Sequence, residues 1–247
     1  MMNPKVYLKM AEVEKDHWWF CSRRKIVKSI IKNHILNGSS EQLKILSVGC
    51  GTGGNFKMLS SFGEIFAMDS DNQAIEISKK LNIGNVKKGK LPYQIPFVNE
   101  NFDIVSATDV LEHVIEDTES LIEISKRLNK KGKLIITVPA HQYLWSKHDE
   151  LHHHIRRYSK KELISKLNKA GYKIDFISYY NFFLFPLVFL MRFFTKNNEN
   201  IKAEDLNRIP NKYINKILEL IFSFEKFFLS LFSFPIGVSI IAVVSKK

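Results

Sequence analysis

The chain has 247 residues, of which 45% are hydrophobic and 25% charged, and 37 Lys and Arg against 25 Asp and Glu give a formal charge of +12. This composition is typical of a globular protein and excludes a long disordered, collagen-like or low-complexity chain. The two cysteines, Cys21 and Cys50, exclude a disulfide framework and indicate a reducing compartment. Because the lysines are spread along the chain, we expect no nucleic-acid partner.

The amino-terminal segment, Met1–Ile35, is expected to form one or two helices and contains an aromatic cluster, HWWF, at His17–Phe20. Residues Met1 to Lys15 mix charged and apolar side chains, so they lack the unbroken apolar core of a secretory signal. We therefore expect a cytoplasmic protein.

The middle of the chain alternates short apolar runs with helical patterns. The run Leu43–Val48 ends in a glycine cluster, which is typical of a buried strand that leads into a turn. Such alternation indicates βαβ units and a parallel sheet that is covered on both faces. Further strands are predicted at Glu64–Met68, Phe102–Ala107, Lys133–Val138, Lys173–Tyr180 and Gly237–Ser245, and helices at Asn72–Leu81, Thr118–Asn129 and Lys160–Ala170.

A second segment outside this alternation, Asn181–Ser233, is rich in Phe and Leu. Its apolar runs are too short, or too often interrupted by charges, for the roughly 20 apolar residues that span a bilayer. Three interpretations stay open, namely a helical cap over the active site, a dimer surface, and a helix pair that lies on a membrane. The chain is thus expected to be a monomer or homodimer, with peripheral membrane contact through 181–234 as one alternative.

The glycine cluster Gly49–Gly54 lies between the first strand and the first helix of the sheet. Glycines let the backbone turn sharply, and the helix beyond the turn offers free N–H groups to a ligand. Asp69 ends the second strand, where a carboxylate can bind both hydroxyls of a ribose. Together these features predict a nucleoside site, although the spacing of Gly49, Gly51 and Gly54 also fits a dinucleotide motif.

The segments VGCGTGG, AMDSD, LPYQIPF and NFDIVSATDVLEHV follow one another in this order. Over about Leu43–Ala140 the chain resembles the class I S-adenosylmethionine-dependent methyltransferases, and the closing segment PIGVSIIAVVSKK adds to the likeness. The resemblance implies a Rossmann-like α/β fold, a seven-stranded class I methyltransferase sheet with an antiparallel last strand. It further implies three parts: a helical lid at 1–40, a core at 41–180 and 235–247, and a Phe-rich helical insertion at 181–234.

The same resemblance implies S-adenosylmethionine as cofactor and S-adenosylhomocysteine as product. In this family, residues at the positions of Gly49, Gly51 and Gly53 line the methionine part of the cofactor. The adenosine would lie against Asp69, Ser70 and the backbone around Lys90 and Leu91, where Lys90 replaces the aspartate of many members. Thr108 and Asp109 would face the methionine ammonium group.

The patterns HWWFxxRR and PAxxxLWSxHDxxxxHxRRYxxxEL resemble a bacterial and archaeal subgroup of these methyltransferases that is often found beside glycosyltransferases and cell-surface polysaccharide or lipid pathways. Since the likeness spans nearly the whole chain, it implies that Trp19 and Arg23 cover the cofactor. Arg23 would then pair with the methionine carboxylate.

The segment Asp109-Val-Leu-Glu112-His113 resembles the ExxEH segment of quinone-biosynthesis O-methyltransferases, in which two carboxylates and a histidine can hold a divalent metal. The alternative is that Glu112 caps a helix and His113 packs beside the cofactor. We predict His113 as a base or acceptor-positioning residue and name no metal ligand.

The long loop after the fifth strand, Val138–Tyr158, is polar, aromatic and rich in histidine, as functional loops often are. We expect His148 and Asp149 to act as an acid/base pair, with Tyr143 as a further catalytic candidate. Three adjacent histidines point in different directions from a helix or strand, which argues against a chelate that uses all three. Arg156 or Arg157 and Tyr158 have a structural alternative, bonding the loop to Asp149.

The function predicted from the sequence is methyl transfer from S-adenosylmethionine to a hydroxyl or amine of a sugar-like or lipid-linked small molecule. A quinone-type phenol is the second choice of acceptor. A nicotinamide-dependent enzyme and a nucleotide-binding protein without turnover are the alternatives from other classes.

Overall fold

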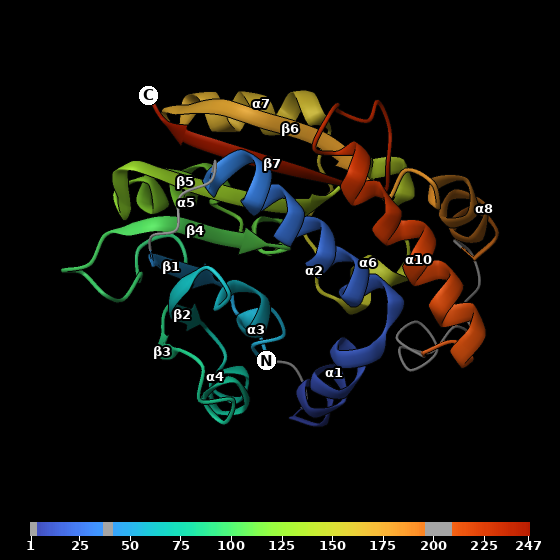
Figure 1. Cartoon of the computed structure of the whole chain (residues 1–247), viewed down its shortest axis with the longest axis horizontal. Helices are drawn as coiled ribbons and strands as arrows, with labels where there is room; N and C mark the ends of the chain where they lie inside the picture. The colour runs from blue at the N-terminus through green and yellow to red at the C-terminus, as the bar shows by residue number, and fades with distance from the viewer. Residues whose placement is uncertain (1–3, 37–41, 196–208) are drawn as a thin grey trace.

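The computed structural model describes residues 4–36, 42–195 and 209–247, and seven strands of these residues form one sheet (Figure 1). In chain order the strands are β1 (Leu43–Val48), β2 (Gly63–Asp69), β3 (Asn85–Lys88), β4 (Phe102–Thr108), β5 (Leu128–Pro139), β6 (Tyr172–Tyr180) and β7 (Ser239–Lys246). Their order across the sheet is β3-β2-β1-β4-β5-β7-β6. Strands β1 to β5 are parallel, and β7 is antiparallel to both β5 and β6. The predicted Rossmann-like sheet is therefore confirmed.

The helices lie between and beside these strands. They are α1 (Pro4–Asp16), α2 (Trp18–Ile31), α3 (Phe56–Leu59), α4 (Asn72–Lys79), α5 (Asp117–Ser125), α6 (Lys147–Leu151), α7 (Lys160–Lys169), α8 (Phe185–Thr195) and α10 (Lys212–Phe228), with short turns η1 (Lys32–Leu36), η2 (Leu111–His113) and η3 (Gln142–Leu144). Several begin at a residue whose side chain accepts a backbone N–H of the first turn, as N-caps do. Asp71 caps α4, Ser159 caps α7 and Asn211 caps α10 in this way.

The core is built on the central strands, which are apolar on both faces because helices cover each face. In β7 the six residues from Ser239 to Val244 are all buried, and in β1 the four from Ile45 to Val48 are buried. By contrast, β3 contributes only Val86 to the core. This single buried side chain explains why no apolar run marked β3 in the sequence.

The amino-terminal segment and the Phe-rich segment pack against each other. Helices α2 and α10 lie side by side in front of the sheet (Figure 1). The backbone N–H of Trp18 donates to Asn215 Oδ1 at 2.9 Å, and Ser22 Oγ donates to the carbonyl of Glu219 at 3.0 Å. Phe222, which is fully buried, contacts the rings of Trp18 and Trp19.

Residues 1–3, 37–41 and 196–208 of the predicted lid and insertion lie outside the described residues. The division of the chain into three parts stays a prediction. Among the helices that are described, none is long and apolar enough to cross a membrane.

Candidate active site

The glycine-rich loop follows β1 at the carboxyl edge of the sheet. Gly49, Gly51 and Gly53 have φ angles of +59°, +54° and +84°, in the left-handed region that favours glycine. A Cβ at Gly51 would meet no atom within 4 Å, whereas one at Gly49 would lie 2.7 Å from Val110 and one at Gly53 would lie 2.7 Å from Leu81. Gly51 therefore leaves room for a ligand, while the other two allow close packing.

Asp69 lies beside this loop because β2 is parallel to β1 and ends next to it. Its Oδ2 accepts the N–H of Gly51 at 2.8 Å, and its Oδ1 accepts the N–H of Asp71 at 3.0 Å. Each oxygen retains a second lone pair for a ligand hydroxyl. Ser70 follows it and is exposed. A carboxylate held in this way beside an open glycine fits the ribose of an adenosine cofactor.

Helix α1 covers the loop with residues that were not predicted. The carboxylate of Glu14 accepts the hydroxyl of Thr52 at 2.7 Å, and a Cβ at Gly54 would lie 2.3 Å from Glu14 Oε2. Burial raises the pKa of Glu14. Tyr7 lies beside Asp71, and burial together with the charge of Asp71 raises its pKa. No sequence signal distinguishes Glu14 from the other carboxylates of an amphipathic helix.

Two residues that were predicted to hold the charged groups of methionine are joined in an ion pair. Asp109, at the end of β4, has a φ of +55°, and its Oδ2 pairs with Arg23 of α2. Its Oδ1 accepts the hydroxyl of Thr137 at 2.8 Å. Burial lowers the pKa of Arg23. Beside them, Asn55 Nδ2 donates to the hydroxyl of Thr108 at 3.0 Å.

The remaining predicted cofactor contacts are Lys90 and Leu91, which follow β3, and Trp19, in the first turn of α2. Lys90 exchanges two backbone hydrogen bonds with Gln94, at 3.0 and 2.8 Å, and Leu91 is buried. Trp19 packs on Phe222, with ring centroids 5.2 Å apart. The roles of these residues toward a cofactor stay predictions.

On the other side of Asp109, η2 carries Glu112 and His113. Glu112 is fully buried, and neither carboxylate oxygen has a hydrogen-bond partner in the described part of the chain. Burial raises the pKa of Glu112 to about 8. His113 is partly exposed, but the protein atoms packed against its ring exclude water from it and lower its pKa to about 4. The sequence missed His154, whose ring centroid lies 4.9 Å from that of His113.

Asp149 is the centre of a buried ion-pair network. Its Oδ1 accepts from Arg157 Nε and His154 Nδ1, both at 2.8 Å, and its Oδ2 accepts from Arg192 at 3.0 Å. Although burial opposes ionisation, these bonds hold the pKa of Asp149 well below its usual range. The structural alternative is thus observed for Arg157, whereas Arg156 and Tyr158 bond to Asp117.

The other two catalytic candidates differ in exposure. His148 Nδ1 is buried and has no hydrogen-bond partner among the described residues, and burial lowers the pKa of this ring. Tyr143 is 54% exposed and stacks on His141, which in turn stacks on Tyr179. These rings form an aromatic stack at the end of β5, in which Tyr143 is exposed and Tyr179 is buried.

The order and direction of the strands agree with comparisons to known proteins. The family model for a methyltransferase domain matches residues 46–136. The chain belongs to the class I S-adenosylmethionine-dependent methyltransferases. An uncharacterized protein of Methanocaldococcus jannaschii is 31% identical to this methyltransferase over 180 residues, which are 68% of this chain and 81% of the relative.

Other relatives match only part of the methyltransferase. The mitochondrial ubiquinone biosynthesis O-methyltransferase of Schizosaccharomyces pombe is 31% identical over 104 residues, 38% of this chain and 37% of that protein. The chain thus spans little more than a third of that relative's length. A crystal structure of the plantazolicin methyltransferase BamL, in complex with a substrate analogue and S-adenosylhomocysteine, has a TM-score of 0.60 at 16% identity, covering 91% of this chain and 85% of that one. At 16% identity, this last similarity shows a shared fold.

Proposed function

We propose that this protein binds S-adenosylmethionine at the carboxyl edge of β1, β2 and β4 and transfers its methyl group to a hydroxyl or amine of a small molecule. The observation that carries the proposal is the juxtaposition of Gly51, Asp69 and the Arg23–Asp109 pair at this edge. S-adenosylmethionine supplies a methyl group on a sulfonium, which an acceptor attacks in line. Positioning then supplies much of the lowering of the barrier.

Each group at this edge would bind a different part of the cofactor. Asp69 accepts the ribose hydroxyls, and Gly51 lets the methionine part lie against the backbone. Arg23 and Asp109 offer one positive and one negative charge to the carboxylate and ammonium of methionine, in place of part of their own pairing. Glu14 of α1 accepts the hydroxyl of Thr52 in the loop, and this contact would help to keep water from the bound cofactor.

The acceptor would approach past η2 and the exposed end of the aromatic stack, which is Tyr143. A hydroxyl acceptor must lose a proton, and His113, His148, Asp149 and Tyr143 stay the candidates for this transfer. The partial likeness to ubiquinone biosynthesis O-methyltransferases supports a phenol as the second choice.

The test of this function is release of S-adenosylhomocysteine with a panel of acceptors that includes lipid-linked sugars and catechols. We expect release that depends on one acceptor class and that falls about tenfold in Asp69→Ala when S-adenosylmethionine is below saturation. Absence of binding to S-adenosylhomocysteine together with tight binding of NAD would support a nicotinamide-dependent enzyme instead.

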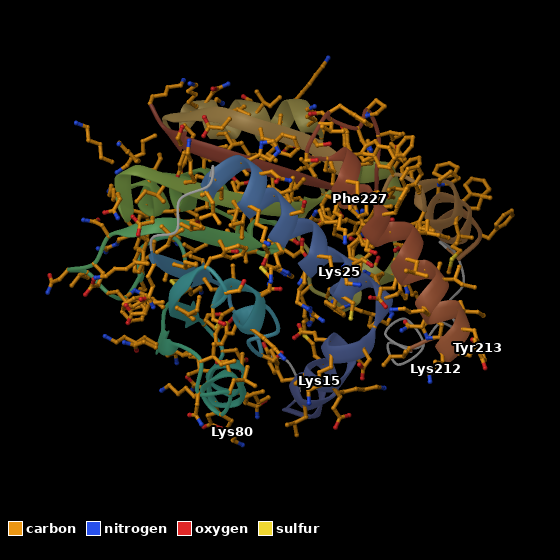
Figure 2. The ribbon with its side chains drawn as sticks, viewed as in Figure 1. Lys15, Lys25, Lys80, Lys212, Tyr213 and Phe227 are labelled. Carbon is orange, nitrogen blue, oxygen red and sulfur yellow. The ribbon has the colours of Figure 1, made fainter. Side chains whose placement is uncertain are left out.

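We also propose that the insertion docks on an anionic membrane surface. One face of α10 packs on α2, and the opposite face exposes apolar side chains at helical spacing, namely Tyr213, Ile217, Leu220, Phe224 and Phe227. Lys212 and Lys216 are exposed beside this face. Figure 2 shows Tyr213 and Phe227 near opposite ends of the helix. Aromatic and apolar residues flanked by lysines suit an interface with anionic headgroups.

Flotation with vesicles of anionic lipid tests this contact. We expect the protein to float at low salt, with a smaller floating fraction at high salt because screening weakens the attraction. Neutral vesicles are the matched control. Failure to float at either salt concentration would overturn the membrane proposal, and a dimer in solution would then favour the dimer surface as the alternative.

A further inference from the structure

Three side chains with metal-binding atoms converge beyond the proposed cofactor site. Glu112 and His113 come from η2, and His154 comes from the segment after α6. One ligand atom of each lies within 4.8 Å of the others. Asp109 is not part of this cluster. Its carboxylate pairs with Arg23, and His154 is the third member instead.

Both imidazole rings are held by their Nδ1 atoms. His154 Nδ1 lies 2.8 Å from Asp149 Oδ1, and the carboxylate of Asp149 is itself anchored by Arg157 and Arg192. His113 Nδ1 lies 3.3 Å from the backbone carbonyl of His153. Since a carboxylate and a carbonyl both accept hydrogen bonds, each ring carries its proton on Nδ1 and keeps a lone pair on Nε2. This is the outer-shell arrangement that orients histidines in metal sites.

The third side chain is a carboxylate that needs a partner. Glu112 is fully buried, and its two oxygens accept no hydrogen bond from any residue that the structure describes. A buried carboxylate without a hydrogen bond or a cation is costly, so native proteins rarely leave one unsatisfied. A metal ion between Glu112 and the two rings would satisfy it.

We propose that Glu112, His113 and His154 bind one divalent transition-metal ion. Two imidazoles and one carboxylate are a ligand set that suits Zn²⁺ and leaves a coordination position for water or another oxygen ligand. His113 is exposed, which gives the ion a path from solvent. The site goes beyond the proposed function and does not depend on it, because the ion can be measured without cofactor or acceptor.

The test starts from full-length protein that has been stripped with a chelator and dialysed. Zn²⁺ is titrated in competition with a chromophoric chelator, and Co²⁺ is titrated while its visible absorption is followed. We expect one equivalent per chain and an intensified Co²⁺ band that reports nitrogen ligation. His154→Ala and His113→Ala should each weaken Zn²⁺ binding by about 100-fold or more, since outer-shell changes alone cost about 10- to 100-fold.

The matched control is His153→Asn, which removes a neighbouring imidazole and keeps the backbone carbonyl that faces His113. Asparagine tolerates the φ of +55° at this position. The control should bind Zn²⁺ as the wild type does. Equal affinity in His154→Ala and the wild type, or a loss in the control as large as in His154→Ala, would overturn the proposal. Thermal unfolding of each apo variant separates a lost ligand from a lost fold, and His113→Ala, at an exposed position, guards against misfolding.

Discussion

At the scale of single residues, the pair between Arg23 and Asp109 joins α2 to the end of β4. Both side chains are largely withdrawn from solvent, and Thr137 bonds the second oxygen of the carboxylate. Removing one partner of such a pair leaves the other charge buried without compensation. The pair therefore couples the covering helix to the edge of the sheet where the cofactor is proposed to bind.

Because the two side chains are coupled, we predict that the effects of substituting them on the free energy of unfolding do not add. Arg23→Met and Asp109→Asn should each lower the free energy of unfolding by about 2–4 kcal/mol, and the double variant should lose less than the sum. Urea unfolding of the four proteins measures the coupling. Strict additivity would mean that the two side chains do not interact in solution.

Glu225 gives a second prediction at this scale. It is fully buried in α10, and its carboxylate accepts the N–H groups of Asn181 and Phe183 at 2.7 and 3.0 Å. Burial raises the pKa of Glu225 to about 7 from its ordinary value of 4.5. The folded state thus binds the proton of Glu225 more tightly than the unfolded state does. The stabilisation that this protonation provides is complete below pH 4.5 and is lost as pH rises through 7.

The free energy of unfolding of the wild type should therefore fall by up to about 3 kcal/mol between pH 5 and pH 8 when it is compared with that of Glu225→Gln. The figure follows from the raised pKa at 1.36 kcal/mol per pKa unit. Thermal and urea unfolding at several pH values measure the difference, with the exposed Glu150→Gln as control. A difference between wild type and Glu225→Gln that stays constant with pH would refute the prediction.

At the scale of elements, α10 has two apolar faces with different surroundings. Phe222 is fully buried between α2 and the sheet, where it contacts Trp18, Trp19 and Tyr180. Phe227 lies on the opposite face and is 57% exposed. The buried face fixes α2, which carries Arg23, whereas the exposed face is the one proposed to meet a membrane.

The two phenylalanines form a matched pair for mutation. Phe222→Ala should lower the free energy of unfolding by about 3–5 kcal/mol, because it leaves a cavity in the core. Phe227→Ala should change it by less than about 0.5 kcal/mol, and on the membrane proposal it should reduce vesicle flotation. Equal stability effects would contradict the packing of α10 on α2.

At the scale of the whole molecule, the sequence predicted most of the fold because the central strands are continuous apolar runs. The one strand it missed, β3, contributes a single buried side chain, Val86. The glycine loop and Asp69 were also predictable, since the loop follows β1 and Asp69 ends β2. Glu14 and His154 were not, because they reach the site through tertiary packing from α1 and from a loop with several adjacent histidines.

The proposed methyl transfer depends most directly on S-adenosylmethionine binding at the edge formed by Gly51, Asp69 and Asp109. The measurement that tests it is calorimetric titration of S-adenosylhomocysteine into the wild type and Asp69→Ala, with thermal unfolding to verify that the variant is folded. We predict micromolar binding that weakens by about tenfold or more in the variant, because roughly 1.5–3 kcal/mol of charged hydrogen bonding is lost. Absence of binding to the wild type, or equal affinity in a folded Asp69→Ala, would contradict the proposed cofactor site.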